Sequence, residues 1–185
     1  VIGGLVLAVI IFVGWGSGIY DTAVAEQEKV NASWANVQAT YQRRADLIPQ
    51  LVATVKGAAE NERGILTAVT EARAGITSAK TPEDLEVAGK KINTAINLAF
   101  EAYPQIRSTE NFADLQAQLE GTENRINVAR QEYNNTVRDY NTYVRGFFKR
   151  MALGWFGGGE DFSVKKGFEA SEGAQEAPKV DFSKP

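Results

Sequence analysis

The sequence predicts an all-α protein in which an N-terminal transmembrane helix is followed by a long antiparallel bundle of three or four helices. Residues 1–20 carry no charged side chain, and beyond them apolar residues recur at helical spacing. Alternating valine-rich segments typical of strands are not found. We divide the chain into a transmembrane anchor (1–20), a helical bundle (21–153) and a tail rich in glycine and charged residues (154–185).

The uncharged N-terminal segment has the length of a membrane span, because a helix of 20 residues extends about 30 Å. Trp15 and Tyr20 lie at its polar end, where aromatic rings favour the headgroup level. A cleaved signal peptide has a shorter apolar core of about 7–15 residues, so we interpret the segment as a retained anchor. Two pairs of small residues have a spacing that lets anchors pack together: Gly4 with Ala8, and Gly14 with Gly18.

Three amphipathic helical patterns follow the anchor, over residues 23–78, 81–103 and 109–151. In the first pattern, Pro49 predicts either a kink or the start of a new helix near Asp46. Thr81 and Pro82 predict the start of the second helix, and Pro104 predicts its end.

The unequal lengths of the first two patterns limit how they pack. Straight helices of about 55 and 22 residues would extend about 80 and 33 Å, so the second cannot cover the first. Either the chain folds back near Pro49 into a four-helix up-and-down bundle, or the first helix finds its partner on another copy. We expect the fold-back, together with self-association in the membrane.

The stretch 145–156 mixes three basic residues with six large apolar ones. One interpretation is a membrane-surface helix. The other, which we favour, is a bundle end packed by aromatic side chains.

The composition excludes several classes of chemistry. The chain has no histidine and no cysteine. At least one of these residues is required by zinc sites, by Cys–His and Ser–His–Asp nucleophile systems and by Glu-x-x-His di-iron bundles. The net charge of −3 does not predict nucleic-acid binding. We therefore expect no enzyme activity, no cofactor and no metal.

Polar residues in or beside the apolar stripes form what we call the polar seam: Arg44, Asp46, Glu62, Arg73, Glu101, Glu123, Arg130, Asn134 and Asn141. Glu123 and Arg130 are seven residues apart, as are Tyr133-Asn134 and Tyr140-Asn141, and this step returns to nearly the same helix face. We interpret the seam as an ion-pair and amide ladder that fixes helix register.

The seam also allows two functional alternatives. The first is a ligand or ion site lined by Glu62, Glu101 and Glu123, with Arg44 or Arg73 binding an anion. The second is acid–base catalysis by the carboxylates, which we favour least because arginines are as numerous.

A series of short motifs in order resembles the bacterial LemA family over essentially the whole chain. The motifs are Trp34-Ala35-Asn36-Val37, 43–49 (RRADLIP), Glu60-Asn61-Glu62, Ala72-Arg73-Ala74, Glu101-Ala102-Tyr103-Pro104, 112–116 (FADLQ), Ala129-Arg130, Tyr133-Asn134, Tyr140-Asn141, Phe168 and 178–182 (PKVDF). The resemblance implies a single-pass membrane protein with an antiparallel four-helix bundle in the cytoplasm and no enzyme activity. One family member is magnetosome-associated, which suggests a membrane-organising role by analogy.

We therefore expect a membrane-anchored scaffold that self-associates and organises a membrane patch or partner proteins. Its expected partners are the bilayer, further copies of itself and other membrane proteins. The alternative is a ligand-binding or accessory module of a transport or envelope-stress system. We expect a bacterial inner-membrane location. The flank after the anchor, with Asp21, Glu26 and Glu28 against Lys29, favours a bundle outside the cytoplasm.

Overall fold

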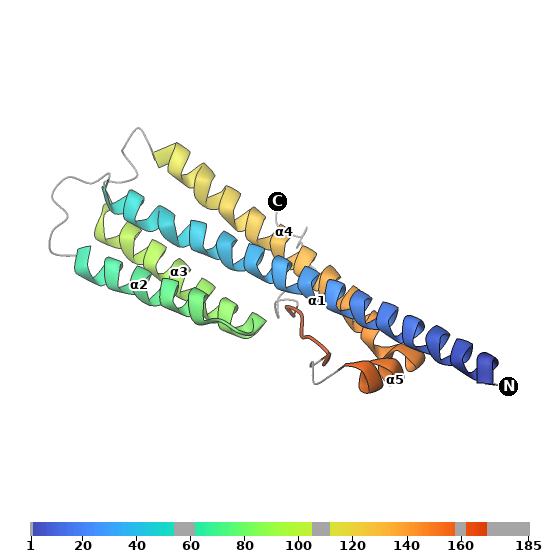
Figure 1. Cartoon of the computed structure of the whole chain (residues 1–185). Helices are drawn as coiled ribbons and strands as arrows, with labels where there is room; N and C mark the ends of the chain where they lie inside the picture. Colours follow the sequence, from blue (N-terminus) through green and yellow to red (C-terminus); the bar gives the residue numbers. More distant parts are fainter. Residues whose placement is uncertain (1, 54–61, 105–111, 158–161, 170–185) are drawn as a thin grey trace, which may run out of the picture.

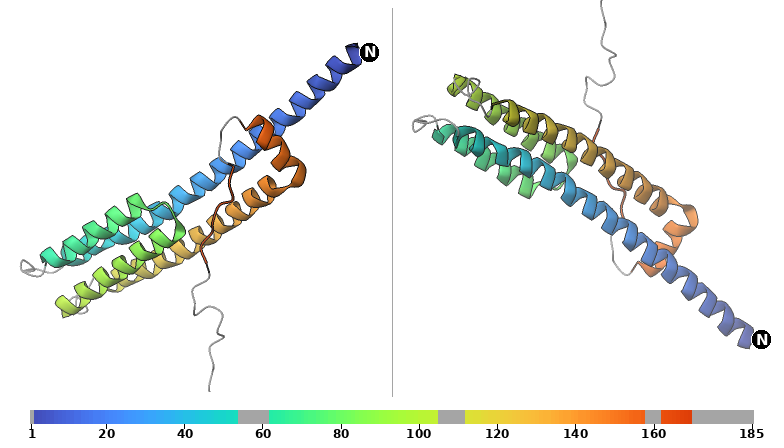
Figure 2. Two further views of the ribbon diagram at one scale, coloured as in Figure 1. Left: turned by 90° about the horizontal axis from the view of Figure 1, so that it is seen from below. Right: turned by 90° about the horizontal axis from the view of Figure 1, so that it is seen from above.

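The computed structural model describes residues 2–53, 62–104, 112–157 and 162–169. Within these ranges the chain forms five helices and no strand, which confirms the all-α fold class. The helices are α1 (Ile2–Ala53), α2 (Glu62–Ser78), α3 (Pro82–Ala102), α4 (Phe112–Arg145) and α5 (Phe147–Phe156). The long helices α1 and α4 lie side by side, and the α2–α3 hairpin packs on the half of the bundle that is distant from the N-terminus (Figures 1 and 2).

Helix α1 runs without interruption through 52 residues, from Ile2 to Ala53, with Pro49 inside it. Of the two alternatives predicted at Pro49, a kink or a new helix near Asp46, the new helix is therefore wrong. Proline removes only one backbone hydrogen bond, and the preceding Leu47 and Ile48 are buried in the core, which holds this part of the helix in place. The chain folds back as expected, but beyond Ala53 and before Glu62.

The N-terminal part of α1 is the one helix among the described residues that is long and apolar enough to cross a membrane. Its most apolar 18-residue window has a mean hydropathy of 2.2, and only 6% of that window is buried inside the protein. A core helix of a soluble protein would be mostly buried. The exposure therefore favours contact with lipid.

The core between α1 and α4 repeats every seven residues. On α1 the repeat is Ala23, Val30 and Val37, and on α4 it is Leu119, Ile126, Tyr133 and Tyr140, all of them buried. Such a step keeps each stripe facing the partner helix along the whole interface. The next position of the α1 repeat is Arg44. A charged side chain therefore occupies a position where the repeat predicts a buried apolar residue.

Two helix boundaries follow local chemistry. Thr81 caps α3 in a capping box with Asp84, whose carboxylate accepts from the backbone N–H of Thr81, as the Thr-Pro sequence predicts. The third predicted pattern is split: α4 ends at Arg145, and α5 starts after Gly146, whose ψ of 132° is extended and not helical. The expected single helix to Met151 is therefore wrong, because Gly146 turns the chain.

Candidate functional site

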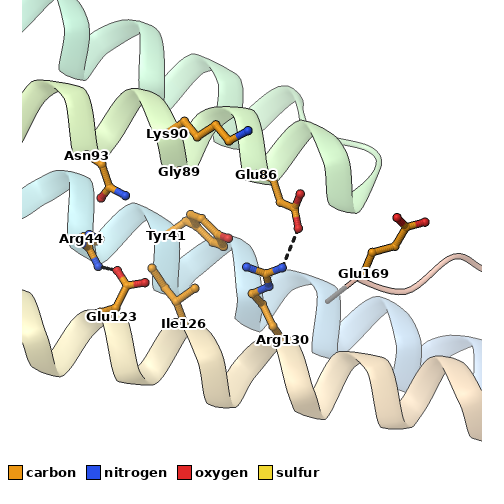
Figure 3. Close-up of a pocket in the computed structure, with 10 residues that line it drawn as sticks. All are labelled: Tyr41, Arg44, Glu86, Gly89, Lys90, Asn93, Glu123, Ile126, Arg130 and Glu169. Carbon is orange, nitrogen blue, oxygen red and sulfur yellow. Dashed lines mark hydrogen bonds and ion pairs between the residues drawn. The ribbon is translucent and has the colours of Figure 1, made fainter. Parts of the chain in front are cut away.

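A polar groove lies between α1, α3 and α4, with a volume of about 490 Å³ (Figure 3). It is lined by Tyr41, Arg44, Glu86, Gly89, Lys90, Asn93, Glu123, Ile126, Arg130 and Glu169. The lining holds three basic and three acidic side chains. The charges therefore balance within the groove.

Arg44 and Glu123 form one ion pair across the groove, between α1 and α4. The Arg44 side chain is only 13% exposed, whereas Glu123 is 51% exposed. The Arg44 Nε is buried without a hydrogen-bond acceptor among the described residues. Burial lowers the pKa of the Arg44 guanidinium below its ordinary value. An arginine this deep depends on Glu123 for its compensation, because an unpaired buried charge is costly.

Arg130 forms the second ion pair of the groove, with Glu86 of α3, at 2.6 Å between Nη2 and Oε1. The Arg130 guanidinium also stacks over the Phe168 ring, 4.6 Å from its centroid. Tyr41 lies between the two ion pairs, and burial is the largest cause that raises the pKa of its phenol. The phenol is therefore neutral at physiological pH and offers a hydrogen bond, not a charge.

Beside the groove, residues 162–169 form an extended segment, which we call the strap, along α4. Asn134 donates from Nδ2 to the Phe168 carbonyl (3.0 Å) and accepts from its backbone N–H (2.7 Å). Asn141 donates to the Lys165 carbonyl (2.8 Å) and accepts from its N–H (2.9 Å). Each asparagine side chain thus donates one hydrogen bond to the backbone of a strap residue and accepts one from it, as a neighbouring β-strand does.

The spacing of the two asparagines matches the spacing of the strap. Seven residues of helix advance about 10.5 Å, and the three residues from Lys165 to Phe168 advance about 10 Å when extended. Asn134 and Asn141 can therefore hold the strap at two points that are in register. The strap runs antiparallel to α4, because the later asparagine binds the earlier strap residue.

The strap ends in an aromatic cluster. Phe168 is buried, with its ring 6.2 Å from Trp34 in a stacked arrangement and 5.6 Å from Tyr133 edge-on. The Tyr133 hydroxyl donates to the Lys166 carbonyl at 3.2 Å. Gly167 leaves room for this approach, because a Cβ there would lie 2.7 Å from Asn134 Oδ1.

The family model of the LemA family matches residues 33–182 of the chain, which include every residue of the polar groove and of the strap. The chain belongs to the LemA family. The match confirms the resemblance seen in the sequence, and it leaves the apolar part of α1 outside the matched range. No protein with a curated description matches the chain.

In this LemA protein the structure brings only part of the polar seam together. Arg44, Glu123 and Arg130 line the groove, while Asp46 pairs with Arg73 to join α1 and α2 outside it. Glu101 is exposed on α3 and is not among the lining residues of the groove. The side chain of Glu62 lies outside the described part of the chain. Of the alternative ligand site of Glu62, Glu101 and Glu123, only Glu123 therefore lines the groove, and the part that depends on Glu62 stays a prediction.

Several groove residues of the LemA chain were not predicted from the sequence to belong to a site: Tyr41, Glu86, Lys90, Asn93 and Glu169. Glu86, Lys90 and Asn93 follow the i, i+4, i+7 spacing of one helix face. That spacing was a usable signal, although the solvent face of any helix produces the same pattern.

Proposed function

We propose that this LemA family member is a membrane-anchored, non-catalytic scaffold that self-associates and organises a membrane patch or partner proteins. The unbroken course of α1 carries the proposal. Between Tyr20 and Ala53 the helix contains no glycine and only one proline. This part extends about 50 Å and is braced by α2, α3 and α4 (Figure 1). A bundle attached in this way stands at a fixed height from the bilayer, as a scaffold requires.

The apolar part of α1 supports self-association through one of its faces. A Cβ added at Gly4, Gly14 or Gly18 would meet no atom within 4 Å, so these positions are open. The opposite side is occupied, because Gly16 lies against the Phe156 ring of α5. Small residues at a spacing of four let two helix backbones approach closely in lipid. We therefore propose that the open face packs against another copy.

Replacing Gly14 and Gly18 together by leucine is expected to weaken self-association of the full-length protein in lipid nanodiscs or mild detergent by roughly tenfold, because the backbones can no longer approach. The measurement is the crosslinked fraction over a range of protein-to-lipid ratios. The control is Val6→Leu with Val13→Leu, on the opposite face by helical spacing, which leaves the fraction unchanged. Equal association of the two variants would contradict the assignment of this face.

Ion pairing within the groove supports a non-catalytic role. The carboxylates of Glu123 and Glu86 each face an arginine, so neither has the environment of a free general base. The described residues contain no group of three or more His, Cys, Asp or Glu that could hold a metal. The alternative, a ligand-binding accessory module of a transport or envelope-stress system, has the groove as its support. It is the weaker candidate because the groove charges balance one another.

We propose a single-pass location in the bacterial inner membrane with the bundle in the cytoplasm. The acidic flank beyond Tyr20 favours the other side. However, α5 and the end of α4 lie beside the apolar part of α1 and add Arg145, Lys149 and Arg150 to the membrane end of the bundle (Figure 1). Basic residues at this level are attracted to the anionic cytoplasmic leaflet. The family resemblance implies the same side.

A further inference from the structure

Helix α5 turns its apolar side outward. Its exposed large side chains are Phe147 (77%), Phe148 (64%), Met151 (38%) and Trp155 (66%). At about 100° per residue these four positions fall on one face of the helix. In a helix that packs only against a bundle, the outward face would be polar. In α5 the outward face is apolar as well as the inward one, which holds the buried Ala152 and Leu153.

The inward face of α5 holds it against the apolar part of α1. Phe12 of α1 lies 5.5 Å from Phe156, measured between ring centroids. It also lies 5.8 Å from Trp155, which is at the border between the inward and outward faces because its side chain is 66% exposed. The lack of a side chain at Gly16 makes room for the Phe156 ring, because a Cβ at position 16 would collide with that ring. On the other end of the contact, the Tyr143 hydroxyl of α4 donates to the Ile19 carbonyl at 3.2 Å. Helix α5 is thus fixed beside the segment that crosses the membrane.

The contact sets the depth of α5 relative to the bilayer. Phe12 lies nine residues before Asp21, the first charged residue of α1, which corresponds to about 13 Å along the helix axis. If the membrane boundary lies near Tyr20, the rings of Trp155 and Phe156 lie inside it. Phe156 lies against both Phe12 and Gly16, which precede Tyr20 by eight and four residues, or about 12 and 6 Å along the helix axis. The shallower value lies within the depth of about 5–10 Å at which interfacial helices place their apolar face, and the deeper value lies slightly beyond it.

Basic residues around α5 fit the phosphate level of the same bilayer. Arg145 and Arg150 are exposed, and Lys149 reaches over the Tyr143 ring with its Nζ 3.9 Å from the centroid. Long basic side chains keep their charge in the headgroup layer while their stems cover apolar surface.

We propose that α5 is a second membrane-contacting element, an interfacial helix whose face of Phe147, Phe148, Met151 and Trp155 inserts into an anionic phospholipid bilayer next to the anchor of its own chain. The proposal rests on the membrane position of α1 but not on self-association. Lipid is favoured over a second copy as the occupant, because this face continues the exposed apolar surface of α1, where Phe12 and Trp15 are 41% and 42% exposed. Two contacts with the bilayer would also fix the tilt and rotation of the bundle.

The chain has no cysteine, so single-cysteine variants of the full-length protein test the proposal directly. Phe148→Cys and Trp155→Cys are labelled with the fluorophore NBD and reconstituted into vesicles of phosphatidylcholine and phosphatidylglycerol. Quenching by doxyl-labelled lipid and by aqueous iodide is then compared. Val6→Cys in the anchor is the lipid-exposed control. Leu98→Cys, 43% exposed on α3 at the far end of the bundle, is the water-exposed control.

We expect doxyl quenching at both α5 positions to exceed that at Leu98→Cys at least threefold and to approach that at Val6→Cys, with iodide giving the reverse order. Vesicles of phosphatidylcholine alone are expected to reduce doxyl quenching at the α5 positions, because the basic residues lose their phosphate partners. Iodide access equal to that of Leu98→Cys would overturn the insertion. Protection from both quenchers would place α5 between copies and overturn the lipid as occupant. Equal quenching in both vesicles would overturn the contact with anionic headgroups.

Discussion

Replacing Glu123 by alanine is expected to lower the free energy of unfolding by about 2 kcal/mol. Arg44 is 13% exposed and would lose the carboxylate that compensates its charge. Breaking a fully buried ion pair costs about 3–5 kcal/mol. We expect a smaller loss of stability here because Glu123 is half exposed, so that water already screens part of its attraction to Arg44. The measurement is urea unfolding of the full-length protein in detergent, followed by circular dichroism.

The double variant Arg44→Met with Glu123→Ala completes this test. It is expected to regain most of the lost stability, because methionine fills the core position of the seven-residue repeat without a charge. Glu120→Ala, on the exposed side of α4, is the control and should stay within about 0.5 kcal/mol of the parent protein. A double variant less stable than Glu123→Ala would contradict the view that the pair compensates a buried charge.

Replacing Asn134 by leucine is expected to release the strap. The change removes both hydrogen bonds to the Phe168 backbone, which contribute about 1 kcal/mol each, and Phe168 then loses its fixed place beside Trp34. A loss of about 2 kcal/mol corresponds to roughly 30-fold faster exchange of the Phe168 amide hydrogen. Hydrogen–deuterium exchange of residues 162–169 in the full-length protein measures this.

The neighbouring residue supplies a matched control for the strap. Asn135 is exposed, and its side chain accepts from Arg138 on the same helix, so Asn135→Leu should leave strap exchange unchanged. Asn134→Asp retains the acceptor for the Phe168 N–H but loses the donor to its carbonyl, and is expected to give an intermediate rate. Equal exchange in Asn134→Leu and Asn135→Leu would show that the strap is held by other contacts.

The helical fold could be predicted because apolar periodicity is a local property of the chain. The stripes of α1 and α4 and the cap at Thr81 were visible in the sequence, and the structure has them. The course of α1 through Pro49 was not predictable in the same way. It depends on the burial of Leu47 and Ile48 against other helices, and this tertiary packing outweighs the local cost of one proline.

The candidate site could be predicted only in part. The seven-residue step marked Asn134 and Asn141, but their partners are backbone groups of the strap, and backbone groups have no residue-type signal. The strap itself belongs to the segment that its composition assigned to the tail, and no burial was predicted there, although Phe168 is buried and Phe162 packs against the core. The pair of Arg130 with Glu86 joins residues 44 positions apart, a separation that single-sequence patterns do not report.

The end of the bundle next to the anchor shows a further limit of predictions made from the linear sequence. A charge count along the flank of the anchor stops well before Lys149 and Arg150. The fold nevertheless returns α5, the helix that contains both residues, to the apolar part of α1 (Figure 2). The same return places Trp155 and Phe156 beside Phe12. Contacts between elements that meet only in three dimensions therefore carry the proposal of how the bundle is attached to the bilayer.

The most direct test of the scaffold proposal is the number of chains in one particle of the unmodified full-length protein, extracted in native-membrane nanodiscs and weighed by mass photometry or native mass spectrometry. We predict particles that contain two or more copies and that persist on dilution, because the open face of the anchor and the rigid α1 favour assembly. Particles that hold a single chain at every concentration, with no other protein bound, would contradict the proposal.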